Sequence, residues 1–281
     1  MPRIDLHLHT TYSDGSHSPA EVIQFAHEAG VTALAITDHD TVDGLPEAIT
    51  AALDKGIKVI PGIELSSRFE GQDTHILGYF FDWQDGTFQT RLTEQQENRE
   101  QRNPRVVDKL NQLGLELTYE EVKAMAGTGS IGRPHIANVL VAKGYVSSTK
   151  EAFDRYLADG ASAYVERESP DTREAIAWIR EAGGVPVLAH PHWTKRKGPE
   201  LIEMCRTLKE AGLMGIEVFY STHSKRQTSE FLELARKLDL LMTGGSDFHG
   251  TAKPGIYVGR GKGDLKVTEK LLEPLRKKVR T

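Results

Sequence analysis

Seven short runs of mainly apolar residues are the feature that most restricts how this chain can fold. They are IDLHL (4–8), ALAIT (33–37), IKVIPG (57–62), THILGYF (74–80), VPVLAH (185–190), GIEVFY (215–220) and LLMTGG (240–245). Helical patterns stand between several of them, and strands that alternate with helices are typical of a parallel sheet or barrel. We therefore expect an α/β barrel in which the carboxyl ends of the strands share one face.

Three helices are predicted between these runs, at residues 18–30, 169–184 and 226–238. In the first, Ser18 is the expected N-cap, Glu21 completes a capping box and Gly30 ends the helix. The second helix repeats this pattern with Ser169 as its expected N-cap. These start and stop signals support the alternating α/β pattern.

Residues 92–165 interrupt the alternation, because they are polar and helical and contain no obvious strand. We interpret them as a small helical insertion domain between the fourth and fifth strands. The expected domains are thus the barrel, formed by residues 1–91 and 166–281, and the insertion, formed by residues 92–165.

Composition limits the class of protein. The formal net charge of −5 over 281 residues argues against a large nucleic-acid-binding surface. No run of about 18 apolar residues occurs, and the N-terminus does not resemble a signal peptide, so we expect no membrane association and a cytoplasmic location. The single cysteine, Cys205, excludes an intrachain disulfide and is expected to be a buried thiol.

Histidine and carboxylate residues gather at the predicted strands. His7 and His9 project from one side of the first strand, because alternate residues on a strand share a face. Most of the others end a strand or follow one: Asp14, His39, Glu64, His75, His190, Asp247 and His249. So many buried polar groups on one face would be unfavourable unless they were paired or metal-bound. Imidazole and carboxylate ligands suit Zn, Fe or Mn.

The stretches DLHLHTTYSDG, ITDHDT, PGIELS, THILGY, LAHPH and SDFHG occur in this order between residues 5 and 249. With these motifs the chain resembles the PHP (polymerase and histidinol phosphatase) family. The resemblance implies a distorted (β/α)7 barrel that holds two or three divalent metal ions.

The resemblance also implies how the ligands divide among three ions. One ion would be held by His7, His9, Glu64 and Asp247, and a second by His75 and His190 with Glu64 as a bridge. A third would be held by Asp14, His39 and His249. Many relatives have His where this chain has Asp14, which favours a harder ion, so we expect Mn, with Fe or Zn as alternatives.

Three divalent ions with Asp14, Glu64 and Asp247 would leave a net charge of about +3, which attracts phosphate. We therefore expect phosphoester hydrolysis by a metal-activated hydroxide, with no covalent intermediate. His192 and Asp40 are the candidate catalytic residues. His192 would protonate the leaving group, and Asp40, like Asp5 and Asp38, would orient an imidazole.

The sequence IGRPHIANVL (131–140) offers a substrate-phosphate site, because Arg133 and His135 would stand at a helix N-terminus. His223 and Lys253 are further candidates for substrate binding. Three arginines, Arg99, Arg102 and Arg105, lie on a helical stretch, and we expect at least two of them to face solvent.

Within the family, the insertion with GRPH, IEVFYSTHS and SDFHG resembles the 3′,5′-nucleotide bisphosphate phosphatases and the related 5′–3′ exoribonucleases of the RNase AM type. The resemblance implies a substrate that is a nucleotide, such as 3′-phosphoadenosine 5′-phosphate or a nucleoside monophosphate, or short RNA trimmed from its 5′ end. The alternatives are a histidinol-phosphate phosphatase, an amidohydrolase and a non-catalytic regulatory or polymerase-associated module.

Overall fold

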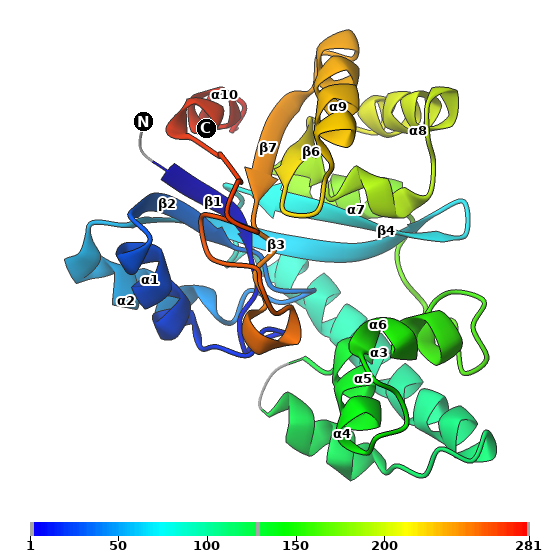
Figure 1. The fold of residues 1–281 in the computed structure, drawn as a ribbon. Coiled ribbons are helices and arrows are strands. Elements are labelled where there is room, and N and C mark those ends of the chain that lie inside the picture. The colour runs from blue at the N-terminus through cyan, green and yellow to red at the C-terminus, as the bar shows by residue number, and fades with distance from the viewer. Residues whose placement is uncertain (1–2, 128–129, 280–281) are drawn as a thin grey trace.

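The fold is organised around a seven-stranded sheet in the order β1-β2-β3-β4-β5-β6-β7. The computed structural model describes residues 3–127 and 130–279. The strands are β1 (Arg3–Leu8), β2 (Val31–Ile36), β3 (Lys58–Phe69), β4 (Gln72–Tyr79), β5 (Val185–Leu188), β6 (Gly215–Tyr220) and β7 (Leu241–Gly245). All seven apolar runs of the sequence therefore correspond to strands, and Figure 1 shows them in a single curved sheet.

The direction of β4 differs from the expected parallel arrangement. β1, β2 and β3 pair in parallel, as do β5, β6 and β7, but β4 runs antiparallel to both β3 and β5. Only Glu70 and Gly71 join β3 to β4, and both have positive φ angles, of 49° and 78°. Such a two-residue link forms a hairpin and is far too short for a parallel crossover.

The first and last strands come together and nearly close the barrel. The Asp247 N–H donates to the His7 carbonyl at 2.8 Å, and the His9 N–H donates to the Phe248 carbonyl at 3.0 Å. Gly245 permits this approach, because a Cβ atom there would lie 2.3 Å from the His7 Cβ. The expected α/β barrel is thus confirmed, with one reversed strand.

Helices cover the outside of the barrel (Figure 1): α1 (Pro19–Glu28), α2 (Leu45–Ala52), α7 (Thr172–Glu181), α8 (Pro199–Glu210), α9 (Lys225–Lys237) and α10 (Leu272–Arg276). Short 3-10 turns occupy η1 (Leu53–Lys55), η3 (Pro191–Thr194), η4 (Gly250–Ala252) and η5 (Glu269–Leu271). The N-cap of α7 is Asp171 rather than Ser169, since the Asp171 carboxylate accepts the Arg173 N–H at 2.8 Å. Apolar residues such as Val22, Ile176 and Cys205 pack α1, α7 and α8 on the sheet, whereas Leu272 of α10 joins a second apolar cluster with Ile4.

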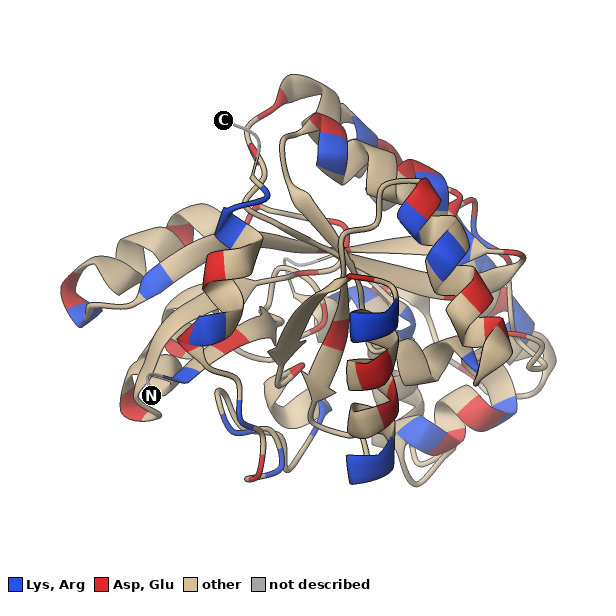
Figure 2. Ribbon diagram, turned by 90° about the horizontal axis from the view of Figure 1, so that it is seen from above, with Lys and Arg blue, Asp and Glu red and all other residues tan. Residues whose placement is uncertain are grey.

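The surface of these helices carries charges of both signs. Figure 2 shows Lys and Arg interspersed with Asp and Glu along the outer helices. None of the helices in the described part of the chain is both long and apolar enough to span a bilayer.

A helical insertion connects β4 to β5 and consists of α3 (Gly86–Gln112), α4 (Tyr119–Ala126), α5 (Arg133–Ala142), α6 (Thr149–Ala152) and the π-helical turn η2 (Phe153–Leu157). It has its own apolar core, which includes Val106, Leu110 and Val122. The first turns of α3 instead pack on the barrel through Phe88 and Leu92. The helix α3 therefore belongs to both cores and fixes the insertion beside the barrel (Figure 1).

Candidate metal centre and substrate cleft

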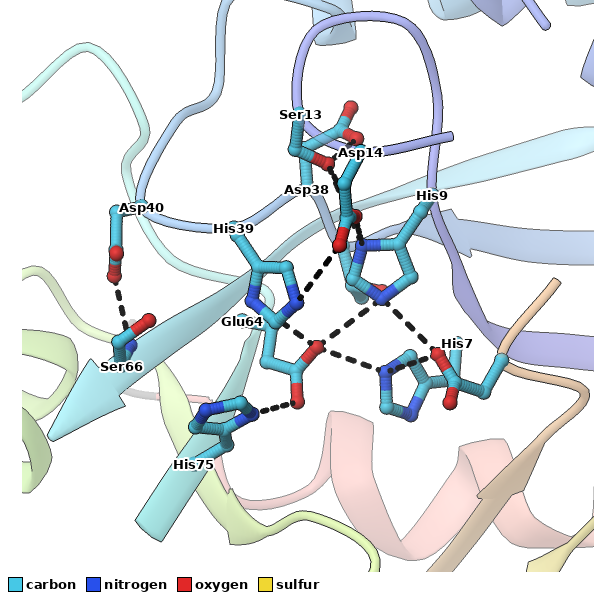
Figure 3. A network of polar contacts seen from close by, with 12 residues as sticks. His7, His9, Ser13, Asp14, Asp38, His39, Asp40, Glu64, Ser66 and His75 are labelled. Carbon is cyan, nitrogen blue, oxygen red and sulfur yellow. Dashed lines mark hydrogen bonds and ion pairs between the residues drawn. The ribbon is translucent and has the colours of Figure 1, made fainter. Parts of the chain in front are cut away.

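Glu64 lies at the centre of a buried cluster of imidazole and carboxylate groups (Figure 3). Its Oε1 atom is 2.9 Å from His75 Nδ1 and 2.7 Å from His190 Nε2. Its Oε2 atom is 3.1 Å from the Nε2 atoms of both His7 and His9. A carboxylate that presents both oxygens to different imidazoles is suited to bridge two metal ions.

Asp247 reaches the same cluster from the last strand. Its Oδ1 atom is 3.5 Å from His7 Nε2 and 3.3 Å from His9 Nε2. The other oxygen, Oδ2, accepts hydrogen bonds from the Tyr220 hydroxyl and from the Lys253 ammonium group, each at 2.5 Å. Residues 240 positions apart in the sequence thus meet because β1 and β7 are neighbours.

A third group surrounds Asp14. His249 Nε2 is 3.2 Å from Asp14 Oδ1, and His39 Nε2 is 3.8 Å from Asp14 Oδ2. His9 also belongs to this group, since its Nδ1 atom is 3.5 Å from Asp14 Oδ1. His39 in addition shares a possible ligand set with Glu64 and His75, while His190 shares one with His7 and Glu64. The nine predicted ligands therefore lie together. However, His9, His39 and His190 each share a possible ligand set with residues that the prediction assigned to a different ion.

The chemistry of this cluster fits divalent ions. His9 Nε2 and His39 Nδ1 are buried without a hydrogen-bond partner, so both nitrogens are available to an ion in the space between the carboxylates. Burial would lower the pKa of His9, but the Asp247 and Glu64 carboxylates raise it to about 9. The carboxylates beside His9 thus favour positive charge there, and imidazole with carboxylate is a donor set for Mn, Fe or Zn.

Glu217 is a functional candidate that sequence reasoning missed. The Nδ1–H group of His7 donates to Glu217 Oε1 at 3.0 Å, and the His190 backbone N–H donates to Glu217 Oε2 at 2.8 Å. This hydrogen bond leaves Nε2, which lies beside Glu64, as the His7 nitrogen that would bind a metal ion. One feature of the sequence could have indicated Glu217: it is the single carboxylate within the apolar run GIEVFY. A charge that is buried in such a strand requires partners.

The three aspartates expected to orient imidazoles have other partners. Asp5 accepts backbone N–H groups of Ser246 and Gly259 at 2.8 and 2.7 Å. Asp38 binds the hydroxyl and the amide of Thr10 at 2.6 and 2.7 Å. Asp40 pairs with the guanidinium groups of Arg99 and Arg167. Correcting the prediction, Asp40 holds arginines rather than an imidazole, because its loop lies beside the insertion.

His192 and His223 form a hydrogen-bonded chain that ends on the backbone. His223 Nδ1–H donates to the Val218 carbonyl at 2.9 Å, so His223 Nε2 accepts the Nδ1–H of His192 at 3.0 Å. Burial and the neighbouring His223 lower the pKa of His192 to about 3. A neutral His192 has no proton on Nε2 to donate, so this arrangement does not favour the predicted general acid.

A cleft of about 480 Å³ lies between the barrel and the insertion and opens beside the cluster. Asp14, His39, His75 and His249 line one end of it. Its other lining residues include Arg68, Arg99, Arg102, Arg133, Lys150, Arg167 and Lys253. Seven basic and two acidic side chains therefore line the cleft, so it is rich in cationic donors although several of them pair with carboxylates and the chain is acidic overall.

Arg102 is a buried cation of the cleft, and among the described residues it forms no ion pair with a carboxylate. It is only 7% exposed, and its hydrogen bonds go to the neutral side chain of Asn103. Burial and the neighbouring guanidinium groups of Arg133 and Arg99 lower its pKa. The expectation that at least two of Arg99, Arg102 and Arg105 face solvent is wrong, since only Arg105 is exposed. Helical periodicity could not show that the barrel covers this face.

Of the other residues predicted to bind substrate, some line the cleft and some do not. α5 begins at Arg133, whose guanidinium lines the cleft and pairs with Asp73 at 2.7 Å. His135 is buried, and its Nδ1 accepts the Gly132 N–H at 2.9 Å. Only its Nε2 is therefore available as a donor. Lys253 lines the cleft, whereas His223 is not among the lining residues.

The PHP domain profile matches residues 5–168, which is more than half of the chain. The chain belongs to the PHP family. The resemblance read from the sequence is thus confirmed, and the barrel with its insertion is the PHP fold.

Similar proteins include two named as enzymes and one with a solved structure. A 5′-3′ exoribonuclease of Haemophilus influenzae is 38% identical over 88% of this chain and 90% of its own length. A 3′,5′-nucleoside bisphosphate phosphatase of Chromobacterium violaceum is 34% identical over 92% of this chain and 91% of its own. The crystal structure of a candidate metal-dependent phosphoesterase from Bifidobacterium adolescentis is 30% identical with a TM-score of 0.89, covering 100% of this chain and 97% of that one.

Proposed function

We propose that this PHP protein is a metal-dependent phosphoesterase that hydrolyses phosphate esters of nucleotides. The substrates would be 3′,5′-nucleotide bisphosphates, nucleoside monophosphates and the 5′ end of short RNA. The observation that carries the proposal is the cationic cleft, which begins at the imidazole and carboxylate cluster and extends away from it. The nucleotide phosphatase and the exoribonuclease among its relatives support the same reaction class.

Two or three divalent ions would be held by the nine imidazole and carboxylate side chains around Glu64, Asp247 and Asp14. When bound, such ions lower the pKa of a water molecule and neutralise charge on a phosphoryl group. Glu217 and the Asp247 carbonyl, which accepts the His249 Nδ1–H at 3.0 Å, would keep His7 and His249 in the tautomer that ligates through Nε2.

The protein's own cations would position the rest of the substrate. Arg102 and Arg133 could each offer N–H donors to a second phosphate, and guanidinium binds phosphate with a matching planar fork. Asp40 keeps Arg99 and Arg167 in place on the cleft wall. A substrate with phosphates at two positions would thus contact both ends of the cleft.

Histidinol phosphate fits this cleft less well. It carries an ammonium group, which would enter a space lined by seven basic and only two acidic side chains. Nucleotides add negative charge or a neutral base instead. The cleft therefore supports a nucleotide substrate over the histidinol-phosphate alternative.

A phosphate-release screen tests the proposal. Purified protein reconstituted in parallel with Mn, Fe or Zn is given nucleoside monophosphates, 3′,5′-bisphosphates, a short 5′-phosphorylated RNA and histidinol phosphate. We expect release from the nucleotides, loss of release in Asp247→Asn, and normal release in the surface control Glu210→Gln. No hydrolysis of any substrate by metal-replete protein would rule out the phosphoesterase.

A further inference from the structure

Trp193 is a large aromatic side chain that the fold leaves half exposed, at 50%. It lies in the turn η3, directly after β5 and the predicted ligand His190. Among the described residues, the other large apolar side chains with comparable exposure are Leu53, Leu113, Met125 and Tyr257, and none of these lines the cleft. Trp193 does line it, so its exposed face is directed at the space where substrate would bind.

The position of Trp193 is fixed by its surroundings. Its backbone N–H donates to the His190 carbonyl at 2.9 Å, and its ring centroid is 4.8 Å from that of His190. The hydroxyl of Thr194 closes the same turn by donating to the Pro191 carbonyl at 2.8 Å. On another side, the Lys253 ammonium lies 5.3 Å from the Trp193 ring centroid. The turn therefore places the ring next to the candidate metal centre, between His190 and Lys253.

Trp193 also borders a side branch of the cleft. This branch, of about 200 Å³, is lined by His190, Trp193 and Lys195 from the barrel and by Arg133 and Phe153 from the insertion. Phe153, His75 and Trp193 line both the main cleft and the branch, so the two spaces adjoin and together form a groove. One aromatic side chain of the barrel, Trp193, and one of the insertion, Phe153, thus line the same groove.

We propose that Trp193 is the stacking platform for the nucleobase attached to the phosphate that is cleaved, with Phe153 on the insertion side of the same groove. This inference rests on the proposed function and specifies how the substrate is recognised. Stacking needs only the face of a base, so it tolerates any base sequence. The contacts of the ring with His190 and Lys253 would limit its motion and so reduce the entropy lost on binding.

Kinetics with matched substrates test the platform. Adenosine 3′,5′-bisphosphate is compared with its abasic analogue, in which hydrogen replaces the base, for the wild type, Trp193→Ala and Trp193→Phe. Loss of one base stack corresponds to roughly a 5- to 100-fold change in binding. We expect Trp193→Ala to raise KM for the nucleotide by this factor, with kcat and the abasic substrate little affected. Trp193→Phe should retain most of the preference, and Tyr257→Ala serves as the exposed-aromatic control.

A binding measurement independent of turnover supports the kinetics. Adenosine 3′,5′-bisphosphate should quench tryptophan fluorescence of the metal-stripped wild type, and the quenching should be lost in Trp193→Phe, which keeps Trp83 and Trp178.

Two outcomes would overturn the platform. An equal loss on nucleotide and abasic substrates would mean that Trp193 acts only through its packing on His190, and unchanged kinetics in Trp193→Ala would mean that the ring does not contact the substrate. If the wild type hydrolyses neither substrate, the proposed function itself fails, which is a different result from hydrolysis without base preference.

Discussion

Glu217 supports the candidate metal centre from behind its histidines. Because it accepts the His7 Nδ1–H and the His190 N–H, it would fix the tautomer of one candidate ligand and the backbone of another. Glu217→Gln removes the charge but keeps the shape. We expect about 10- to 100-fold weaker metal binding, measured by competition with a chromophoric chelator.

The matched control for this substitution is Glu210→Gln, on the exposed end of α8. The circular dichroism spectra of both variants should match that of the wild type. A metal affinity equal to that of the wild type in Glu217→Gln would show that His7 keeps its orientation without the carboxylate.

Cys205 allows a prediction about reactivity. Its thiol is completely buried in α8, and burial raises its pKa to about 12. A thiol becomes a reactive thiolate only as the pH approaches its pKa, so the native protein should resist an aromatic disulfide reagent at mildly alkaline pH. Denatured protein should react at once, with Cys205→Ala as the blank. Rapid stoichiometric labelling of native protein would contradict this burial.

The role of a single residue could be predicted from the sequence where the pattern that indicates it lies within one short segment. His7 and His9 alternate on one strand, and SDFHG follows another, so these candidate ligands could be selected from the sequence, and the structure brings them together. Glu217 and Arg102 could not be assigned, because their roles arise from neighbours on other elements. The ligand roles themselves remain predictions that metal binding must test.

At the level of elements, the contact between the loop after β2 and α3 depends on one carboxylate. Asp40 is fully buried, accepts the Ser66 N–H at 2.7 Å and pairs with Arg99 and Arg167. Asp40→Asn would leave two guanidinium groups without a countercharge. We expect a loss of about 3–5 kcal/mol in the free energy of unfolding, measured by denaturant titration.

The control for the Asp40 substitution is Asp43→Asn, an exposed aspartate of the same loop. Its unfolding midpoint should stay within experimental error of the wild type. If both variants unfold at the wild-type midpoint, the buried ion pairs do not anchor α3.

Strand direction was the element-level property that the sequence pattern left undetermined. Apolar runs and turn signals located seven strands, but they do not state which way a strand runs. The two residues between Phe69 and Gln72 were the local clue to a hairpin. The reversal explains why His75 lies in the first half of its strand whereas His190 follows one, because the start of β4 and the end of β5 lie on the same face of the barrel.

For the molecule as a whole, metal ions should contribute to stability. The nine candidate ligands are mostly buried, and three of them are carboxylates whose charges bound ions would balance. An ion present at about 100 times its Kd adds about 2.7 kcal/mol to the stability of the native state. We expect Tm to fall after dialysis against a chelator and to recover when Mn is added. The recovery should be much smaller in Asp247→Asn, and an unchanged Tm would contradict a metal-supported core.

The shared helix α3 has a consequence for how the protein can diversify. Its first turns are part of the barrel core and its later turns are part of the insertion core, so the two parts cannot rotate freely about a linker. A chimaera that exchanges the insertion between relatives should therefore be joined within α3, between Leu92 and Val106, rather than in the loop before Gly86. Substrate preference could then be transplanted without rebuilding the catalytic barrel.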